Sequence, residues 1–346
     1  MYFLHKRTLL STALLMAFSM AHAADPVGVW IEGTLNADEN FININVDEAA
    51  LVSGWSATTT AGVYVGTNTQ AIFSGDTTKV AIQNQLTDKQ TSGFAIQGGA
   101  TVAFSAKDTI IDVKSLGSSG KFGFGLIIED AGSSAIFDGN NVSITTQQDN
   151  HTAQSFSVFG GTSASFNNVG DVYIEAKSKV SVTGANIYGE TLFNNKGNVV
   201  IHSEILDGGT SLINAVGLQS WNSNFKVTEN VDTFKISVLG QGVDNNGTTY
   251  STGSIAMALE AAHAELNSKV VDISIVAPSD SVVTVPPSMT AKDAIGVQVL
   301  DGINAYPNPT EFYGSSFITG EDTQLNINVD TGLIPSNAYG LLVESN

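Results

Sequence analysis

The residues of this chain that could do chemistry are few and widely spaced. After the first 23 residues the sequence has three histidines, His151, His202 and His263, and no cysteine. A metal centre or a nucleophile–base pair needs several such groups converging on one point, and nothing in the spacing of the histidines brings them together. The motifs of serine hydrolases, zinc proteases and P-loop proteins are absent. The sequence therefore predicts no catalytic residue, no metal site and no cofactor.

Carboxylate pairs are the next candidates, because a polysaccharide hydrolase needs two acidic groups at a defined separation. The candidate pairs are Glu129 with Asp130 and Glu321 with Asp322 in predicted turns, and Asp171 with Glu175 on the solvent side of one predicted strand. Solvated turns and strand faces explain all three pairs without catalysis. A lyase that uses an arginine base is excluded, because Arg7 is the only arginine.

Aromatic residues supply the predicted contact surface. The three tryptophans are dispersed along the sequence and form no stacking platform by spacing alone. Tyr306, Phe312 and Tyr313 instead cluster in a proline-rich segment. Loops that project from a rigid scaffold commonly carry binding residues. These three aromatic residues are therefore the candidate contact loop.

The N-terminus, residues 1–23, has the pattern of a cleaved secretory signal peptide. Lys6 and Arg7 precede a short apolar stretch, and Ala21 and Ala23 frame a small-residue cleavage site. No later segment has 18 consecutive apolar residues, so we expect no transmembrane helix. The sequence thus predicts an exported protein.

The net charge limits the partners that the chain can bind, and the lack of cysteine limits how it can be stabilised. Without residues 1–23 the chain keeps 12 lysines against 33 acidic residues, a net charge of −21. Nucleic-acid binding is excluded, because phosphate neutralisation needs clustered Lys and Arg. Without cysteine there is no disulfide framework, so a large core or a repeat array must supply the stability.

The strands that must position these residues recur as a repeat along the sequence. A strand phrase with alternating apolar and polar residues recurs, first about every 30 residues and then more widely. Its central residues are Ile82, Val113, Ile144, Ile174, Ile201, Ile236, Ile273 and Ile327. Two further short strands precede several of these phrases, as GFAI (93–96) and VAF (102–104) precede IIDVKS (110–115). One repeat is therefore strand, tight turn, strand, polar turn, strand and linker.

Three strands per repeat without a helical segment predict an all-β, right-handed, single-stranded parallel β-helix, a pectin-lyase-like solenoid, over 24–346. We expect eight or nine coils, about 4.8 Å apart. Ile96, Phe104, Phe137 and Phe166 are predicted to stack in the core. The segment 254–267 is predicted as strand, turn and strand. Prolines between 278 and 309 predict a loop-rich insertion at about 277–315.

The signal peptide, the lack of cysteine and the Gly/Asn/Ser/Thr-rich repeats resemble the passenger region of a bacterial autotransporter, the type V secretion family. The resemblance implies a non-enzymatic, adhesin-like protein at the cell surface that binds a host or bacterial glycan or protein. That family carries a C-terminal translocator barrel, which this sequence lacks, so we expect a truncated chain, located in the periplasm if no translocator exists. A β-helical polysaccharide hydrolase and an inactive fragment of a split gene remain alternatives.

Overall fold

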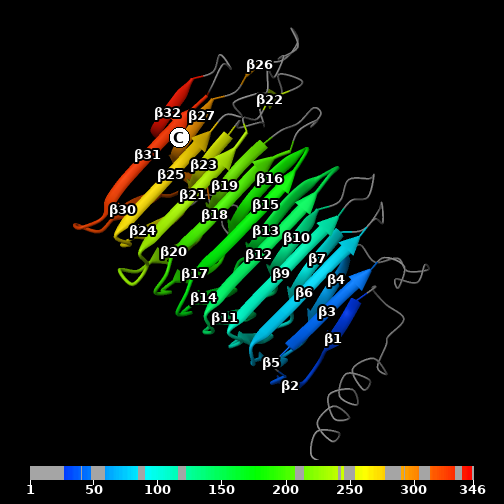
Figure 1. Cartoon of the computed structure of the whole chain (residues 1–346). Coiled ribbons are helices and arrows are strands. Elements are labelled where there is room, and N and C mark those ends of the chain that lie inside the picture. Colours follow the sequence, from blue (N-terminus) through cyan, green and yellow to red (C-terminus); the bar gives the residue numbers. More distant parts are fainter. Residues whose placement is uncertain are drawn as a thin grey trace, which may run out of the picture.

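The protein is a right-handed parallel β-helix, seen from the side in the computed structural model of Figure 1. The structure describes residues 27–39, 41–47, 59–84, 90–115, 122–206, 214–240, 243–244, 254–276, 290–291, 293–303, 312–331 and 337–344. The predicted signal peptide lies outside these ranges. Three long sheets, here named A, B and C, contain ten, nine and nine strands, and each strand pairs in parallel with its equivalent in the next coil. The predicted fold class is confirmed.

Each coil contributes one strand to each sheet in the order A, B, C. Sheet A consists of β1 (Val27–Ile31), β4 (Thr59–Val65), β7 (Gln90–Ile96), β10 (Gly123–Ile128), β13 (Thr152–Val158), β16 (Ser181–Ile187), β19 (Asn214–Trp221), β23 (Ser254–Glu260), β27 (Ala294–Leu300) and β32 (Ala338–Glu344). Sheet B consists of β2 (Thr34–Ala37), β5 (Gln70–Phe73), β8 (Thr101–Phe104), β11 (Ser134–Phe137), β14 (Ser163–Phe166), β17 (Glu190–Phe193), β20 (Asn224–Val227), β24 (His263–Leu266) and β30 (Ser316–Thr319). Sheet C consists of β3 (Phe41–Asp47), β6 (Thr77–Asn84), β9 (Asp108–Ser115), β12 (Asn141–Gln148), β15 (Val172–Ser178), β18 (Val199–Ile205), β21 (Thr233–Leu239), β25 (Val270–Val276) and β31 (Gln324–Asp330).

The recurring phrase forms sheet C, and its central isoleucines make one inward row. Ile144 pairs with Ile174, and the row continues through the later predicted centres to Ile327. Two of the predicted central residues do not belong to this row. Val113 pairs with Thr146, whereas Ile144 pairs with Ile111. Ile82 shares the row of Val113, two residues further along the strand. Several inward positions of one strand accept Ile or Val, so composition alone did not fix the register.

Phenylalanine fills the inward row of sheet B. The rings of Phe104 and Phe137 are 4.7 Å apart and nearly parallel, and the ring of Phe166 stacks 4.6 Å from Phe137. Phe73 and Phe193 extend the stack at its two ends. Predicted core positions are thus confirmed, including Ile96 on sheet A, which is fully buried.

Glycine lines the inner side of sheet A where it approaches sheet C. A Cβ atom at Gly125 would lie 2.5 Å from Cγ2 of Ile144, and one at Gly217 would lie 2.4 Å from Cγ2 of Ile236. Glycine is therefore favoured at these two positions, because a Cβ atom would force the isoleucine row to shift. This contact brings the two sheets close together along the coil stack.

The later coils keep the same plan. Segment 254–267 forms β23 and β24 with a turn between them, which confirms its predicted strand–turn–strand structure. Within the predicted insertion, β27 is a regular strand of sheet A, whereas 277–289 and 304–311 lie outside the described residues. Two short antiparallel pairs join β22 (Val243–Asp244) to β26 (Thr290–Ala291), and β28 (Gly302–Ile303) to β29 (Phe312–Tyr313). No helix in the described part of the chain is long and apolar enough to cross a membrane.

Candidate functional site

The outer face of sheet C carries a cluster of ionisable side chains on β15 and β18. Along β15, buried and partly exposed residues alternate, so Tyr173, Glu175 and Lys177 all face outward. The parallel register places Glu175 beside His202 and Lys177 beside Glu204. Side chains far apart in sequence thereby become direct neighbours on one face.

These side chains contact one another through ion pairs and a hydrogen bond. The Lys177 Nζ atom lies 3.2 Å from Oε1 of Glu175 and 2.9 Å from Oε2 of Glu204. The Tyr173 hydroxyl donates a 2.6 Å hydrogen bond to Oε1 of Glu175. We name Tyr173, Glu175, Lys177, His202 and Glu204 the sheet C cluster.

His202 is held from the other side by the next coil. Its Nδ1 atom lies 2.7 Å from Oγ of Ser237 on β21, and its Nε2 atom lies 3.8 Å from Oε2 of Glu204. Glu175, His202 and Glu204 each offer a ligand atom, and these atoms all lie within 4.8 Å of one another. Within the described ranges this is the one such grouping of histidine and carboxylates.

Burial shifts the proton affinities in the cluster. Burial lowers the pKa of His202, against the opposing charges of Glu175 and Glu204, so the imidazole is neutral near pH 7. Burial raises the pKa of the Tyr173 hydroxyl, and the hydrogen bond to Glu175 raises it further. Burial lowers the pKa of Lys177, but its hydrogen bonds to Glu204 and Glu175 outweigh that effect and leave the pKa raised.

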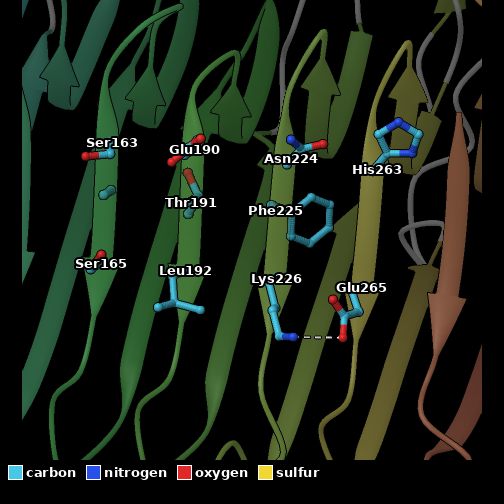
Figure 2. A pocket seen from close by; sticks show the side chains of 11 residues that line it. Ser163, Ser165, Glu190, Thr191, Leu192, Asn224, Phe225, Lys226, His263 and Glu265 are labelled. Atoms are coloured by element: carbon cyan, nitrogen blue, oxygen red, sulfur yellow. Dashed lines mark hydrogen bonds and ion pairs between the residues drawn. The ribbon is translucent and has the colours of Figure 1, made fainter. Parts of the chain in front are cut away.

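A second feature is a hollow of about 530 Å³ on the outer face of sheet B, which we name the strand hollow (Figure 2). Two rows of side chains cross β14, β17, β20 and β24 here. One row is Ser163, Glu190, Asn224 and His263, and the other is Ser165, Leu192, Lys226 and Glu265. Lys226 and Glu265 form an exposed ion pair of 2.9 Å, so the hollow is lined by both charges, by neutral polar groups and by the apolar residues Leu192, Ala164 and Phe225.

A second hollow of about 430 Å³ adjoins the first at the turns between sheets A and B, and we name it the turn hollow. It shares Ser163, Glu190 and Asn224 with the strand hollow and adds Tyr188. Tyr188 belongs to an aromatic row across three coils. Its ring lies 5.7 Å from Phe159, nearly parallel to it, and 5.5 Å from Trp221.

The predicted carboxylate pairs do not form two-carboxylate sites. Glu129 accepts a hydrogen bond from Gln97, and Asp130 accepts one from the backbone N–H of Gly98. Asp171 lies just before β15 and Glu175 lies within it, and four residues along an extended chain span about 13 Å. Glu321 and Asp322 lie in an exposed turn. The acidic groups that do converge, Glu175 and Glu204, lie outside both hollows.

The remaining predicted residues are separated. His151 contacts the ring of Phe122 and His263 lies in the strand hollow, so the three histidines stay apart, as expected from their spacing. Tyr306 lies outside the described residues. Phe312 and Tyr313 form β29, and their side chains also lie outside the described part. The contact loop therefore stays a prediction.

Neither the sheet C cluster nor the aromatic row was predicted from the sequence. The cluster could have been found by aligning VYIEAK (172–177) with VVIHSE (199–204), which places Glu175 on His202 and Lys177 on Glu204. No comparable signal marks the aromatic row, since Phe159, Tyr188 and Trp221 lie at the ends of strands whose spacing varies.

Comparison with known proteins adds no relative. No family model matches the chain, and neither the curated proteins nor the solved structures yield a significant match.

Proposed function

We propose that this protein is an exported, non-enzymatic binding protein of the adhesin-like autotransporter-passenger type, and that it binds a glycan in the strand hollow and the turn hollow. The signal-peptide pattern at 1–23 supports export. The single observation that carries the binding role is the aromatic row of Phe159, Tyr188 and Trp221, whose Tyr188 lines the turn hollow next to the strand hollow.

The aromatic row suits the apolar face of a sugar ring. Tyr188 and Trp221 are partly exposed, and each joins an apolar ring to a polar group. The three rings come from three successive coils, so a chain molecule lying along the β-helix axis can contact all of them. Next to them, Glu190 and Asn224 offer hydrogen-bond acceptors and a donor for hydroxyl groups.

The size of the strand hollow and the extent of both hollows are compatible with binding of a polymer. A hollow of about 530 Å³ lies within the range of about 300–1,000 Å³ typical of ligand sites. Both hollows extend over several coils, because each is lined by residues of successive sheet B strands or turns. A polymer with repeated units therefore matches this surface better than a compact metabolite does.

The hydrolase alternative receives less support from the hollows. Glu190 and Glu265 lie on strands two coils apart and two residues apart along the chain direction, so their backbones are about 12 Å apart. The two carboxylates therefore belong to different strands and to different rows of the hollow. Glu265 is also paired with Lys226.

Binding of the purified protein to an array of acidic and neutral glycans tests the proposal. We expect binding to a subset of glycans, and we expect Tyr188→Ala and Trp221→Ala each to weaken it by about tenfold. Tyr173→Ala is the matched control, because Tyr173 is a partly exposed tyrosine on sheet C, away from both hollows.

Three results would contradict the proposal. Equal glycan binding by wild type and Tyr188→Ala would show that the glycan site lies elsewhere on the protein. Binding to none of the glycans would reject a glycan ligand. Turnover of a bound glycan that is lost in Glu190→Gln would favour the hydrolase.

A further inference from the structure

We propose that Glu175, His202 and Glu204 form a binding site for a divalent transition-metal ion, with Zn²⁺ as the best match. Their ligand atoms lie within 4.8 Å of one another, on adjacent strands of one rigid sheet. Tetrahedral coordination at Zn–ligand distances of about 2.1 Å places ligand atoms about 3.4 Å apart, so rotamer shifts of about 1 Å complete the site. This proposal is independent of glycan binding.

Each ligand is already oriented by a second contact. The Tyr173 hydroxyl holds Oε1 of Glu175, which leaves Oε2 for an ion. Ser237 contacts Nδ1 of His202 at 2.7 Å, so with Nδ1–H as the donor the Nε2 lone pair faces Glu204. Metal-binding histidines are commonly fixed in this way through the other ring nitrogen.

Lys177 is bound to the two carboxylates that the ion would need. Its ammonium group bridges Glu175 and Glu204, so it neutralises one of their two charges. The lysine side chain is 31% exposed and ends on a flexible stem, so it can turn into solvent when an ion binds. The site therefore exchanges a monovalent ammonium group for a divalent ion, and Lys177 is a built-in competitor.

The ligand types select the ion. One imidazole nitrogen and two carboxylate oxygens match Zn²⁺, which also retains an open position for water on the outer face. Ca²⁺ prefers six to eight oxygen ligands, which the sheet C cluster does not offer. We therefore expect Zn²⁺ to bind well above Ca²⁺ in affinity.

Titration of the purified protein with Zn²⁺ against a chromophoric chelator tests the site, with Ca²⁺ as a parallel titration. We expect one Zn²⁺ per chain. His202→Gln and Glu204→Gln should each weaken binding by at least about tenfold, whereas Lys177→Gln should tighten it because the competitor is gone. The Lys177→Gln result separates a metal site from a salt-bridge network, which would only lose a contact.

His263→Gln is the matched control. His263 also contacts a serine of the next coil through Nδ1, at 2.8 Å from Oγ of Ser316, but it lacks the two convergent carboxylates. Its Zn²⁺ affinity should equal that of wild type. Circular dichroism spectra of all variants establish that the fold is kept. Co²⁺ added to wild type should give a visible absorption band that Zn²⁺ removes, which tests the site even if a variant fails to fold.

The proposal is overturned by any of three results. These are no Zn²⁺ binding and no Co²⁺ band in wild type, equal affinities of wild type and a folded His202→Gln, or weaker binding by Lys177→Gln.

Discussion

Gly217 on sheet A lies directly against Ile236 on sheet C, and a Cβ atom at Gly217 would approach Cγ2 of Ile236 to 2.4 Å. The carbonyl oxygen of Ala256 would be 2.5 Å away on the other side. Gly217→Ala should therefore lower the free energy of unfolding by about 1–3 kcal/mol through overpacking. Urea unfolding measures this loss. Gly160→Ala is the control, since its nearest neighbour would lie 4.0 Å away, and an equal loss there would contradict the steric argument.

Phe137 sits in the middle of the phenylalanine stack and is fully buried between Phe104 and Phe166. Phe137→Ala leaves a cavity that the fixed coil spacing cannot close, so we expect a loss of about 3–5 kcal/mol in unfolding free energy. Ile136→Ala changes the neighbouring residue, whose side chain points outward, and should cost less than about 1 kcal/mol. Similar losses for the two variants would show that the stack does not stabilise the core.

Asn168 is a fully buried side chain at the turn between sheets B and C. Its amide donates to the carbonyl oxygens of Asn140 at 2.8 Å and Gly170 at 3.0 Å, and thereby ties two coils together. Asn168→Ala removes these two hydrogen bonds between coils, so the unfolding free energy should fall by about 1–3 kcal/mol. Asn167→Ala, at the exposed neighbour, is the comparison in the same urea titration. The hypothesis fails if the two variants unfold alike.

The pH dependence of stability should reflect His202. In the folded protein, burial lowers the pKa of His202 below its ordinary value of 6.5. The charges of Glu175 and Glu204 oppose this shift, and those of Lys177 and Lys235 add to it. Below about pH 6.5 the unfolded state therefore binds more protons than the folded state, so the stability falls as the pH falls. Between about pH 7.5 and 5.5, wild type should lose more unfolding free energy than His202→Gln.

His263→Gln is the histidine control for the pH measurement, because it leaves the sheet C cluster intact. Its loss of stability over the same pH range should exceed that of His202→Gln. Identical pH profiles for wild type and His202→Gln would show that the buried imidazole does not contribute.

Most of the fold follows from local patterns in the sequence. The alternation in phrases such as VYIEAKS (172–178) predicts which side chains point inward, and the structure confirms the alternation on β15. The register between strands was harder to predict, because Ile111 and Val113 both face inward on β9 and either could pair with Ile144. The close approach of sheets A and C was not predicted, since a glycine before an apolar strand also has local turn explanations.

The candidate sites needed the register before they could be recognised. Glu175 and His202 are ordinary solvent-facing residues in sequence, and only the pairing of β15 with β18 makes them neighbours. Trp221 is isolated in sequence, but its ring lies 5.5 Å from that of Tyr188. Residues on a solenoid surface are assembled across coils, so motif searches along the chain miss them.

The equivalence of successive coils has a consequence for how such a protein can change length. Ser134 and Ser163 occupy the same register position 29 residues apart, as do Phe137 and Phe166. Excising 134–162 would join Ser133 to Ser163 and place Phe166 on Phe104, which is again a phenylalanine pair. The product would be about 4.8 Å shorter with an unaltered cross-section. Gain or loss of whole coils is thus a route by which reach can vary while the core chemistry is preserved.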